Sequence, residues 1–234
     1  MLKVNDLKVN YGQAQVIFGL SIEVADGQIT SIIGPNGAGK STLLNTIAGL
    51  LRQNSGEIVF NEEHLENLPT RERVAKGLVL CPERRRLFAN LKVIENVMLG
   101  AYLRKDDKIA SDLERVYELF PILKERKNQL AGTLSGGEQQ FVAISRSLMS
   151  APKLIMLDEP SIGLSPLMRE RIFDAILKIR ELSNLTVLIV EQDAVDALSI
   201  ADRSLVLESG TITMQGNKNE LMGNAHVKEA FLGL

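Results

Sequence analysis

Apolar and polar residues alternate near the N-terminus with the two-residue period of a half-buried strand. Residues 20–24 read Leu-Ser-Ile-Glu-Val, so the apolar side chains share one face. Asp26-Gly27 then supplies a tight turn, and the apolar run Ile29 to Ile33 predicts a second strand. Two strands joined by a short turn are therefore expected at the start of the chain.

Short apolar runs and helical periodicity alternate in the rest of the chain. Leu154–Leu157 and Thr186–Val190 are apolar runs between polar residues, and both are predicted to be buried strands. A helix is expected between them, with Pro166 in its first turn. Alternation of buried strands and helices predicts a mostly parallel α/β core. The helix between these strands has the apolar stripe Ile172, Phe173, Ile176, Leu177 and Ile179, and an earlier helix has Leu43, Leu44, Ile47 and Leu51.

Residues 93–149 differ from the core in their pattern, because helical spacing dominates and strand signals are few. We expect a helical subdomain here, inserted into an α/β core formed by residues 1–92 and 150–234, all within one domain of residues 1–234. The apolar positions behind this expectation are Val93, Val97, Leu99 and Leu103, and then Leu113, Val116, Leu119 and Phe120.

Composition excludes several classes of protein. The chain has 27 Lys and Arg against 29 Asp and Glu, a formal net charge of −2, so it lacks the broad basic field of a dedicated nucleic-acid binder. The single cysteine, Cys81, excludes an internal disulfide and a cysteine-cluster metal site. The first residues lack the apolar stretch of a signal peptide, and no run reaches the roughly 18 apolar residues that span a bilayer. We expect a soluble protein of a reducing compartment, with no nucleic-acid partner.

A glycine-rich loop follows the strand at residues 29–33 and precedes the first predicted helix. It reads Gly34-Pro35-Asn36-Gly37-Ala38-Gly39-Lys40-Ser41-Thr42, which fits the strand–GxxxxGK[ST]–helix pattern of phosphate-binding loops. The glycines let backbone N–H groups converge on phosphate oxygens, and the helix directs its positive end at the same place. Lys40 would neutralise the β- and γ-phosphates, and the Ser41 hydroxyl would ligate Mg²⁺. Nucleotide binding is therefore predicted.

Two carboxylates end the buried strand at residues 154–157. Asp158 and Glu159 precede Pro160, at the strand end where open α/β sheets place their ligands. We expect Asp158 to hold Mg²⁺ through water, and Glu159 to orient and deprotonate the attacking water. An apolar strand that ends in two acids is weak evidence alone, but it becomes strong beside a phosphate loop.

A third motif separates the chain from other phosphate-loop proteins. Leu134-Ser135-Gly136-Gly137-Glu138-Gln139-Gln140 precedes a helix whose stripe is Phe141, Ile144 and Leu148, and it again brings a hydroxyl and glycine N–H groups to a helix start. A serine-capped helix explains Ser135 but not the two glycines followed by Glu138-Gln139. With this motif the chain resembles the ATP-binding-cassette ATPases, whose signature is LSGGQ or LSGGE. The resemblance covers essentially all 234 residues, because the motifs occur in family order and at family spacing.

The resemblance implies a P-loop NTPase core with an N-terminal antiparallel β subdomain and an inserted α-helical subdomain. It implies ATP and Mg²⁺ as cofactors, and ATP held between two cassettes arranged head to tail. Leu134, Ser135, Gly136, Gly137 and Glu138 would then serve the partner's ATP, and a lone monomer would be nearly inactive. Tyr11 matches the aromatic residue that stacks on adenine, although a core tyrosine is the alternative.

Two departures from the family pattern concern the catalytic site. Glu83 stands where most members have a glutamine that senses Mg²⁺ and the transmembrane partner, and Gln192 stands where most have a switch histidine. Gln192 can donate an amide hydrogen bond to the γ-phosphate but cannot take up a proton near neutral pH. Glu83 is a third candidate Mg²⁺ ligand with Ser41 and Asp158, and it would add negative charge beside Asp158 and Glu159.

These departures together resemble one subfamily, the ATPases of branched-chain amino-acid importers. More particularly, they resemble the half of the heterodimeric pair that carries Pro-Glu and Glu-Gln at these positions, although Arg84 stands where that subfamily is expected to have glycine. The resemblance implies transmembrane permease subunits, a second cassette ATPase in a heterodimer or homodimer, and indirectly a periplasmic or extracellular solute-binding protein. It also implies a peripheral position on the cytoplasmic face of the cell membrane.

Other functions remain open from the sequence. Importers of urea and short-chain amides use similar ATPases, and a single-cassette soluble ATPase could serve macromolecular assembly. A generic phosphate-loop kinase is disfavoured by the motif at residues 134–140. The segment with Leu87, Phe88, Leu91 and Val93 is expected either to form the family's groove for a coupling helix of the membrane partner or to pack in the core.

Overall fold

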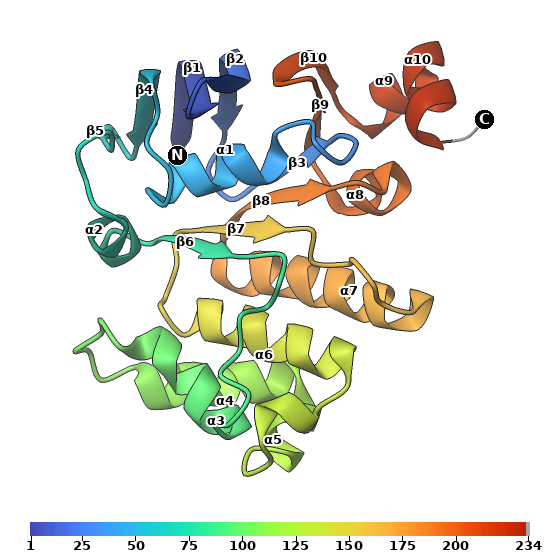
Figure 1. Cartoon of the computed structure of the whole chain (residues 1–234). Coiled ribbons are helices and arrows are strands. Elements are labelled where there is room, and N and C mark those ends of the chain that lie inside the picture. Colours follow the sequence, from blue (N-terminus) through green and yellow to red (C-terminus); the bar gives the residue numbers. More distant parts are fainter. Residues whose placement is uncertain (233–234) are drawn as a thin grey trace.

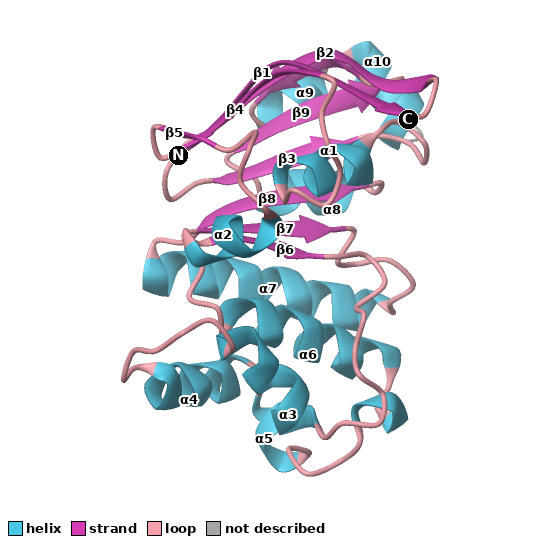
Figure 2. Cartoon of the chain, turned by 60° about the vertical axis from the view of Figure 1, so that its left-hand side comes forward, coloured by secondary structure: helices cyan, strands magenta, loops and turns pink. Residues whose placement is uncertain are grey.

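Two β-sheets and a group of helices follow one another along the molecule in the computed structural model, which describes residues 1–232 (Figure 1). The last two residues of the predicted domain, 233–234, lie outside the described residues. A small sheet lies at one end, a larger sheet lies in the middle, and most of the helices gather at the other end (Figure 2).

The small sheet is antiparallel throughout and has the strand order β2-β1-β4-β5. The predicted alternation at residues 20–24 is confirmed, since the three apolar side chains are buried and the two polar ones exposed. The N-terminal strand was not predicted. Its period breaks at Asn5-Asp6, where two successive residues are exposed and the register shifts. The strands of the small sheet are β1 (Leu2–Tyr11), β2 (Ala14–Val24), β4 (Ser55–Phe60) and β5 (Glu63–His64).

The larger sheet has the order β10-β9-β3-β8-β7-β6 and is parallel except for its β9–β10 edge. Every residue of its three central strands is buried, as expected for a sheet covered on both faces. The predicted strands at 29–33, 154–157 and 186–190 are confirmed. The strands are β3 (Ile29–Ile33), β6 (Leu78–Cys81), β7 (Leu154–Asp158), β8 (Thr186–Glu191), β9 (Arg203–Glu208) and β10 (Thr211–Gly216).

Helices connect and cover these strands. The long helix after Pro166 begins at that proline, as predicted, and four of its five stripe residues are buried while Leu177 is partly so. The α-helices are α1 (Lys40–Ile47), α2 (Thr70–Ala75), α3 (Val93–Met98), α4 (Ile109–Leu119), α5 (Pro121–Glu125), α6 (Gly136–Leu148), α7 (Pro166–Ser183), α8 (Ala194–Ile200), α9 (Lys218–Gly223) and α10 (Ala225–Val227). The described residues also form two 3₁₀ turns, η1 (Leu99–Ala101) and η2 (Ala131–Thr133), and a π-helical turn, η3 (Lys228–Leu232).

The central strands divide their side chains between two apolar clusters. Leu154 and Met156 of β7 pack with α1 and the small sheet, whereas Ile155 and Leu157 pack with α6, α7 and the helical region. Alternation along a strand sends successive side chains to opposite faces. Helix α1 therefore lies between the two sheets, where its first turn faces the carboxyl ends of the central strands (Figure 1).

Every regular element between residues 93 and 148 is a helix. Helix α6 lies inside this group (Figure 2), and Phe141, Val142, Ala143 and Ile144 are all buried. The buried face of α6 is therefore wider than the predicted apolar stripe of Phe141, Ile144 and Leu148. The ring of Phe120 stacks on that of Phe141, with 4.7 Å between centroids.

Two predicted helices end earlier than their apolar spacing suggested. Helix α1 stops at Ile47, and Leu51 lies beyond it, because Gly49 adopts a left-handed backbone (φ 78°) that ends the helix. Leu103 lies beyond the η1 turn that follows α3. The left-handed Gly49 ends the first helix, and a 3₁₀ turn replaces the last turn expected of the second.

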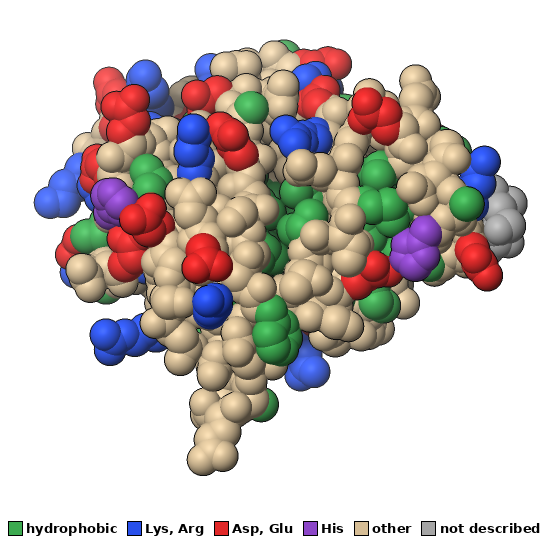
Figure 3. All heavy atoms as spheres, turned by 90° about the horizontal axis from the view of Figure 1, so that it is seen from above, with side chains coloured by type: hydrophobic (Ala, Val, Ile, Leu, Met, Phe, Trp, Pro, Cys, Tyr) green, Lys and Arg blue, Asp and Glu red, His purple; other side chains and the backbone are tan. Residues whose placement is uncertain are grey.

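Two further features concern membrane-spanning helices and surface charge. No helix within residues 1–232 is both long enough and apolar enough to cross a lipid bilayer. On the face above the small sheet, Lys and Arg side chains are interspersed with Asp and Glu side chains (Figure 3).

Candidate nucleotide-binding site

The phosphate loop connects β3 to α1 and reverses direction through left-handed glycines. Gly37 has φ 83° and Gly39, the residue that caps α1, has φ 108°. A side chain at either position would be strained. The Ala38 N–H donates to the Pro35 carbonyl at 3.2 Å, which holds the loop in a tight curve at the positive end of α1.

Lys40 is buried in the centre of this loop. Its ammonium group donates to the carbonyls of Gly34 at 2.7 Å and Pro35 at 3.1 Å. The same Nζ atom lies 3.0 Å from Glu159 Oε1. The lysine therefore connects the phosphate loop to the acid that follows β7.

Ser41 and Asp158 meet between α1 and the end of β7. The Ser41 hydroxyl donates to Asp158 Oδ1 at 3.0 Å. Burial, and to a lesser extent the charges of Glu159 and Glu83, raises the pKa of Asp158 to about 6, against the opposing effect of the Ser41 hydrogen bond.

These oxygens fit the ligands that Mg²⁺ prefers, a hydroxyl and a carboxylate on adjacent elements. Among residues 1–232, no three His, Cys, Asp or Glu side chains are grouped as a complete metal site. Mg²⁺ in nucleotide sites is held by one or two protein ligands and by phosphate oxygens. Ser41 and Asp158 are the residues that would hold it.

Glu159 has an unusual backbone at the turn after β7. Its φ of 45° is left-handed, a conformation that costs about 1–3 kcal/mol for a residue with a side chain and is concentrated at functional sites. Its N–H donates to the Val190 carbonyl of β8 at 3.0 Å. Its side chain lines a hollow of about 490 Å³ with Val16, Asn36, Gly37, Gly39, Lys40, Ser41, Thr42, Glu83 and Ile162.

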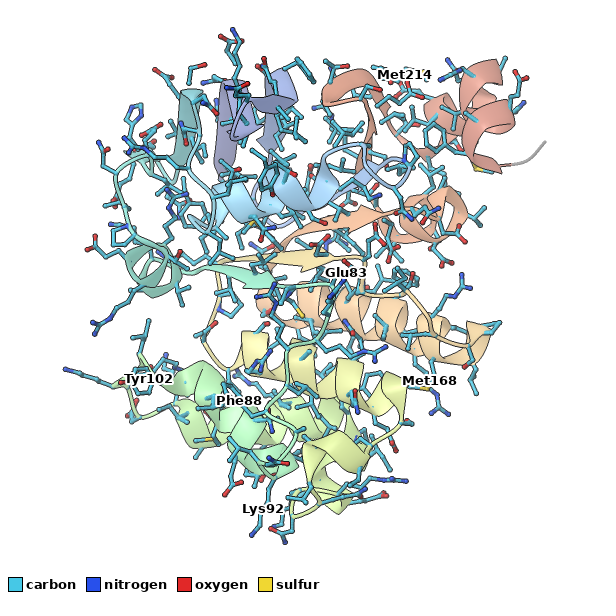
Figure 4. All side chains as sticks on the ribbon, viewed as in Figure 1. Glu83, Phe88, Lys92, Tyr102, Met168 and Met214 are labelled. Carbon is cyan, nitrogen blue, oxygen red and sulfur yellow. The ribbon has the colours of Figure 1, made fainter. Side chains whose placement is uncertain are left out.

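Glu83 reaches the same hollow from the loop after β6 and is half-buried (Figure 4). This loop turns sharply, because Arg85 and Arg86 both have left-handed backbones. Arg146 of α6 donates to the carbonyls of Arg85 at 2.6 Å and Arg86 at 2.8 Å. Arg84, where glycine was expected, points into solvent and does not occupy either left-handed position.

Gln192 follows β8 and is exposed. It faces a second hollow of about 460 Å³ that it shares with Glu159. The switch position and the acid thus border one space. The other lining residues are Ser161, Ile162, Gly163, Arg169, Glu191, Asp193, Val195 and Phe231.

One functional candidate was missed by the sequence analysis. Glu191 is only 2% exposed, and its Oε1 accepts a hydrogen bond from the Ser161 N–H at 3.1 Å. Burial raises the pKa of Glu191 to about 7, and the nearby charges of Glu159 and Asp196 act in the same direction. The available signal was a carboxylic acid at the end of an otherwise apolar, buried strand.

The signature residues Leu134–Glu138 lie just before and at the start of α6, apart from the chain's own phosphate loop. The Ser135 hydroxyl accepts from the Glu138 N–H at 3.4 Å, while the Glu138 carboxylate accepts from the Ser135 N–H at 2.9 Å, which is a capping box. Gly137 is packed against Met168 of α7, whose place at the end of that helix is visible in Figure 4. No residue of Leu134–Glu138 is among the described residues that line the phosphate-loop hollow.

Tyr11 lies at the end of β1 and is 52% exposed. The alternative of a core tyrosine is therefore wrong. Tyr11 is not among the residues that line the phosphate-loop hollow. Stacking of its ring on adenine therefore stays a prediction.

The protein-family model described as "ABC transporter" matches residues 17–162. The chain belongs to the ABC transporter family. The high-affinity branched-chain amino acid transport ATP-binding protein BraG of Pseudomonas aeruginosa is 45% identical over 233 residues, covering 100% of both chains.

Solved structures of cassettes have the same fold. The ADP conformation of an ATP-binding cassette of an ABC transporter has a TM-score of 0.87 and 28% identity, and covers 100% of this chain and 99% of that one. A dimeric, post-hydrolysis cassette bound to ADP and Pi has a TM-score of 0.83 and 25% identity, and the match covers 93% of this chain and 99% of that one. The family and fold expected from the motifs are confirmed, and the chain is a nucleotide-binding ABC ATPase.

Proposed function

We propose that this chain is the ATP-hydrolysing subunit of an importer for branched-chain, hydrophobic amino acids. The observation that carries the proposal is the meeting of α1 and the end of β7, where Lys40 lies 3.0 Å from Glu159 and Ser41 lies 3.0 Å from Asp158. These four side chains bring a cation, a hydroxyl and two carboxylates to one phosphate-binding loop. The likeness to BraG over the whole chain supports the choice of substrate class.

Each residue of the loop has a role in this proposal. Backbone N–H groups of residues 34–42 and the Lys40 ammonium hold the phosphates, and Tyr11 stacks on adenine. Binding of the phosphates draws Lys40 away from Glu159, which frees the carboxylate to orient and deprotonate the attacking water. Gln192 donates its amide hydrogen bond to the γ-phosphate.

Mg²⁺ is the metal that this donor set fits. Ser41 would hold it directly and Asp158 through water, while Glu83 approaches the same hollow from the loop after β6. When bound, Mg²⁺ neutralises negative charge on the transferred phosphate. Glu83 lines this hollow already, and the membrane partner pushes its loop further inward toward the Mg²⁺ position, so that substitution by Gln would change the coupling of ATP use to transport.

Two cassettes form the active unit. The signature residues Leu134–Glu138 are absent from the hollow beside the chain's own phosphate loop, and a cassette of the same fold is dimeric when bound to ADP and Pi. The signature therefore serves the ATP of a second cassette. We place a histidine-bearing cassette opposite this one, because two Gln192 subunits would have no titrating switch residue.

The membrane partner docks on the helical region. Phe88 is 58% exposed there, and its backbone is fixed because its N–H donates to Asn96 Oδ1 at 2.9 Å and its carbonyl accepts from Asn96 Nδ2 at 3.0 Å. Tyr102, on the same group of helices (Figure 4), is 82% exposed. Leu87 and Leu91 are half-buried, whereas Val93 is buried and belongs to the core. The permease so bound holds the chain on the cytoplasmic face of the membrane, and a solute-binding protein acts through the permease.

The test is capture of the assembled complex. Tagged Glu159→Gln, loaded with ATP, is purified from membranes of the source cell, and its partners are identified by mass spectrometry. We expect a polytopic membrane protein and a second cassette. Phe88→Asp should lose the membrane protein, while the matched control Leu182→Asp, at a residue that is also exposed but lies at the end of α7, should keep it.

Recovery of soluble partners alone would contradict the importer and favour an assembly ATPase. Loss of the membrane protein in both variants would remove the assignment of Phe88 to docking.

A further inference from the structure

Glu191 is a buried acid that the proposed reaction does not use. It is the last residue of the central strand β8, and no cation among the described residues pairs with it. Lys40 contacts Glu159, and Arg169, which lines the same hollow as Glu191, contacts Asp193 and Asp196. A buried carboxyl without an ion-pair partner costs free energy, so its presence needs a specific contact.

That contact is the backbone of the loop after β7. The three residues Glu159, Pro160 and Ser161 have only two N–H groups, because proline has none. The Glu159 N–H donates to the carbonyl of Val190 at 3.0 Å, and the Ser161 N–H donates to the side chain of Glu191 at 3.1 Å. Both available N–H groups are therefore held by consecutive residues at the end of β8.

The backbone of the same residue reaches the phosphate loop. The Glu191 carbonyl accepts from the Gly34 N–H at 3.3 Å, and Ile33 pairs with Glu191 across the β3–β8 ladder. Residue 191 is thus the junction of three segments: the phosphate loop, the loop that carries Glu159, and the segment that begins with Gln192.

We propose that Glu191 is a positioning residue, which fixes the loop carrying Glu159 against the end of β8 and so sets the distance between Glu159 and Gln192. The inference rests on the proposed function of Glu159 as the base. A left-handed residue such as Glu159 persists only where its surroundings over-determine it. The Glu191 carboxylate accepts from the Ser161 N–H on the far side of this turn.

The acceptor atom matters more than the charge. Ser161 is buried, and its N–H would lose its partner if residue 191 had no acceptor, at a cost of about 1–3 kcal/mol. Glutamine keeps an acceptor oxygen at the same distance from the backbone. Methionine keeps the length and volume of the side chain but provides only a weak sulfur acceptor.

The test compares Glu191→Gln and Glu191→Met with a control at the other end of the same strand. Thr186 is also buried, and its Oγ1 accepts from the Gly27 N–H at 2.9 Å, so Thr186→Val removes an equivalent hydrogen bond remote from the loop. ATP turnover, the KM for ATP and the melting temperature are measured on the chain in complex with its partner subunits.

We expect Glu191→Met to lower kcat by about 10- to 100-fold, as misplacement of a catalytic group does, with the KM for ATP unchanged within about threefold. Glu191→Gln should retain more than half of the wild-type kcat, and Thr186→Val should lower the melting temperature without lowering kcat. A wild-type kcat in Glu191→Met, or an equal loss in Glu191→Gln or in Thr186→Val, would overturn the proposal. If Glu191→Met does not fold, Glu191→Asp is used in its place, because its side chain is one methylene shorter and moves the carboxyl away from the Ser161 N–H. A lower kcat then supports the proposal and a wild-type kcat overturns it.

Hydrogen exchange separates this inference from the proposed function. Deuterium uptake by residues 159–165 should be faster in Glu191→Met than in the wild type, Glu191→Gln and Thr186→Val, whether or not the complex hydrolyses ATP. Unchanged uptake in Glu191→Met would overturn the positioning role. Absence of turnover in the wild-type complex would instead contradict the proposed function.

Discussion

Lys40 Nζ lies 3.0 Å from Glu159 Oε1, and both side chains are buried. The two residues are far apart in the sequence, and they meet because parallel strands β3 and β7 lie on either side of β8 and end at the same edge of the sheet. The cation proposed to bind phosphate and the acid proposed to activate water therefore neutralise each other across one hollow.

This pair makes a prediction for stability without nucleotide. Lys40→Met should lower the free energy of unfolding by about 3 kcal/mol, because removal of one partner leaves a buried, unpaired charge. Adding Glu159→Gln should restore more than half of that loss. Urea unfolding of the two single variants and the double variant measures the coupling. Strictly additive effects would show that the pair does not contribute as a unit.

Glu159→Gln alone should separate ATP binding from hydrolysis. Glutamine keeps the shape of the side chain but cannot accept the proton from water, so turnover should fall by 10² to 10⁴-fold, as is typical of a lost general base. ATP affinity should stay, and ATP-bound cassette pairs should accumulate in size-exclusion chromatography. Turnover within about tenfold of the wild type would remove Glu159 from the chemistry.

The two signature glycines should differ in their tolerance of a side chain. A Cβ on Gly137 would overlap Met168 of α7, whereas the nearest atoms to a Cβ on Gly136 are those of the Arg85 guanidinium at 3.5 Å. Because the overlapped atoms are mainly the flexible end of Met168, Gly137→Ala should lower the free energy of unfolding by about 1 kcal/mol, the low end of the usual cost of overpacking, while Gly136→Ala should be nearly neutral. Met168→Ala in the Gly137→Ala background should restore stability. Equal effects of the two alanines in thermal unfolding would contradict this packing.

Glu191 should make stability depend on pH. Its pKa is raised from 4.5 to about 7 in the folded chain, so the folded state binds more protons than the unfolded state between these values. The free energy of unfolding should therefore fall as pH rises from about 4.5 to 7, by about 3 kcal/mol from this group. The charged groups that face it are Glu159 and Asp196, and both raise its pKa.

Glu191→Gln should flatten this decline, while Thr186→Val should keep it. Chemical denaturation at several pH values between 4 and 8 measures both slopes. An unchanged slope in Glu191→Gln would assign the pH dependence to other groups.

The sequence predicts the parts of this fold whose signals are local. The phosphate loop and strands β3, β7 and β8 are each identified by a contiguous motif or an apolar run. Strand β1 is not predicted because a bulge at Asp6, with φ 45°, interrupts its alternation of apolar and polar residues. Strand β6 has only four residues, too few for a period to be recognised.

The residues of the candidate site are likewise predicted only where their signals are local. The motifs identify Lys40, Ser41, Asp158 and Glu159, but the pairing of Lys40 with Glu159 depends on sheet topology rather than on any local pattern. Glu191 was missed because its partner is a backbone N–H thirty residues away. No side chain in the sequence marks such a donor.

ATP hydrolysis at Glu159 is proposed to drive uptake of branched-chain amino acids. The most direct measurement is accumulation of radiolabelled leucine by source cells that lack the chromosomal copy of this chain and produce either the wild type or Glu159→Gln. We expect leucine accumulation with the wild type and its loss with Glu159→Gln, at equal amounts of both proteins in the membrane. Equal accumulation with both chains, or wild-type-dependent uptake of urea or an amide but not of leucine, would contradict it.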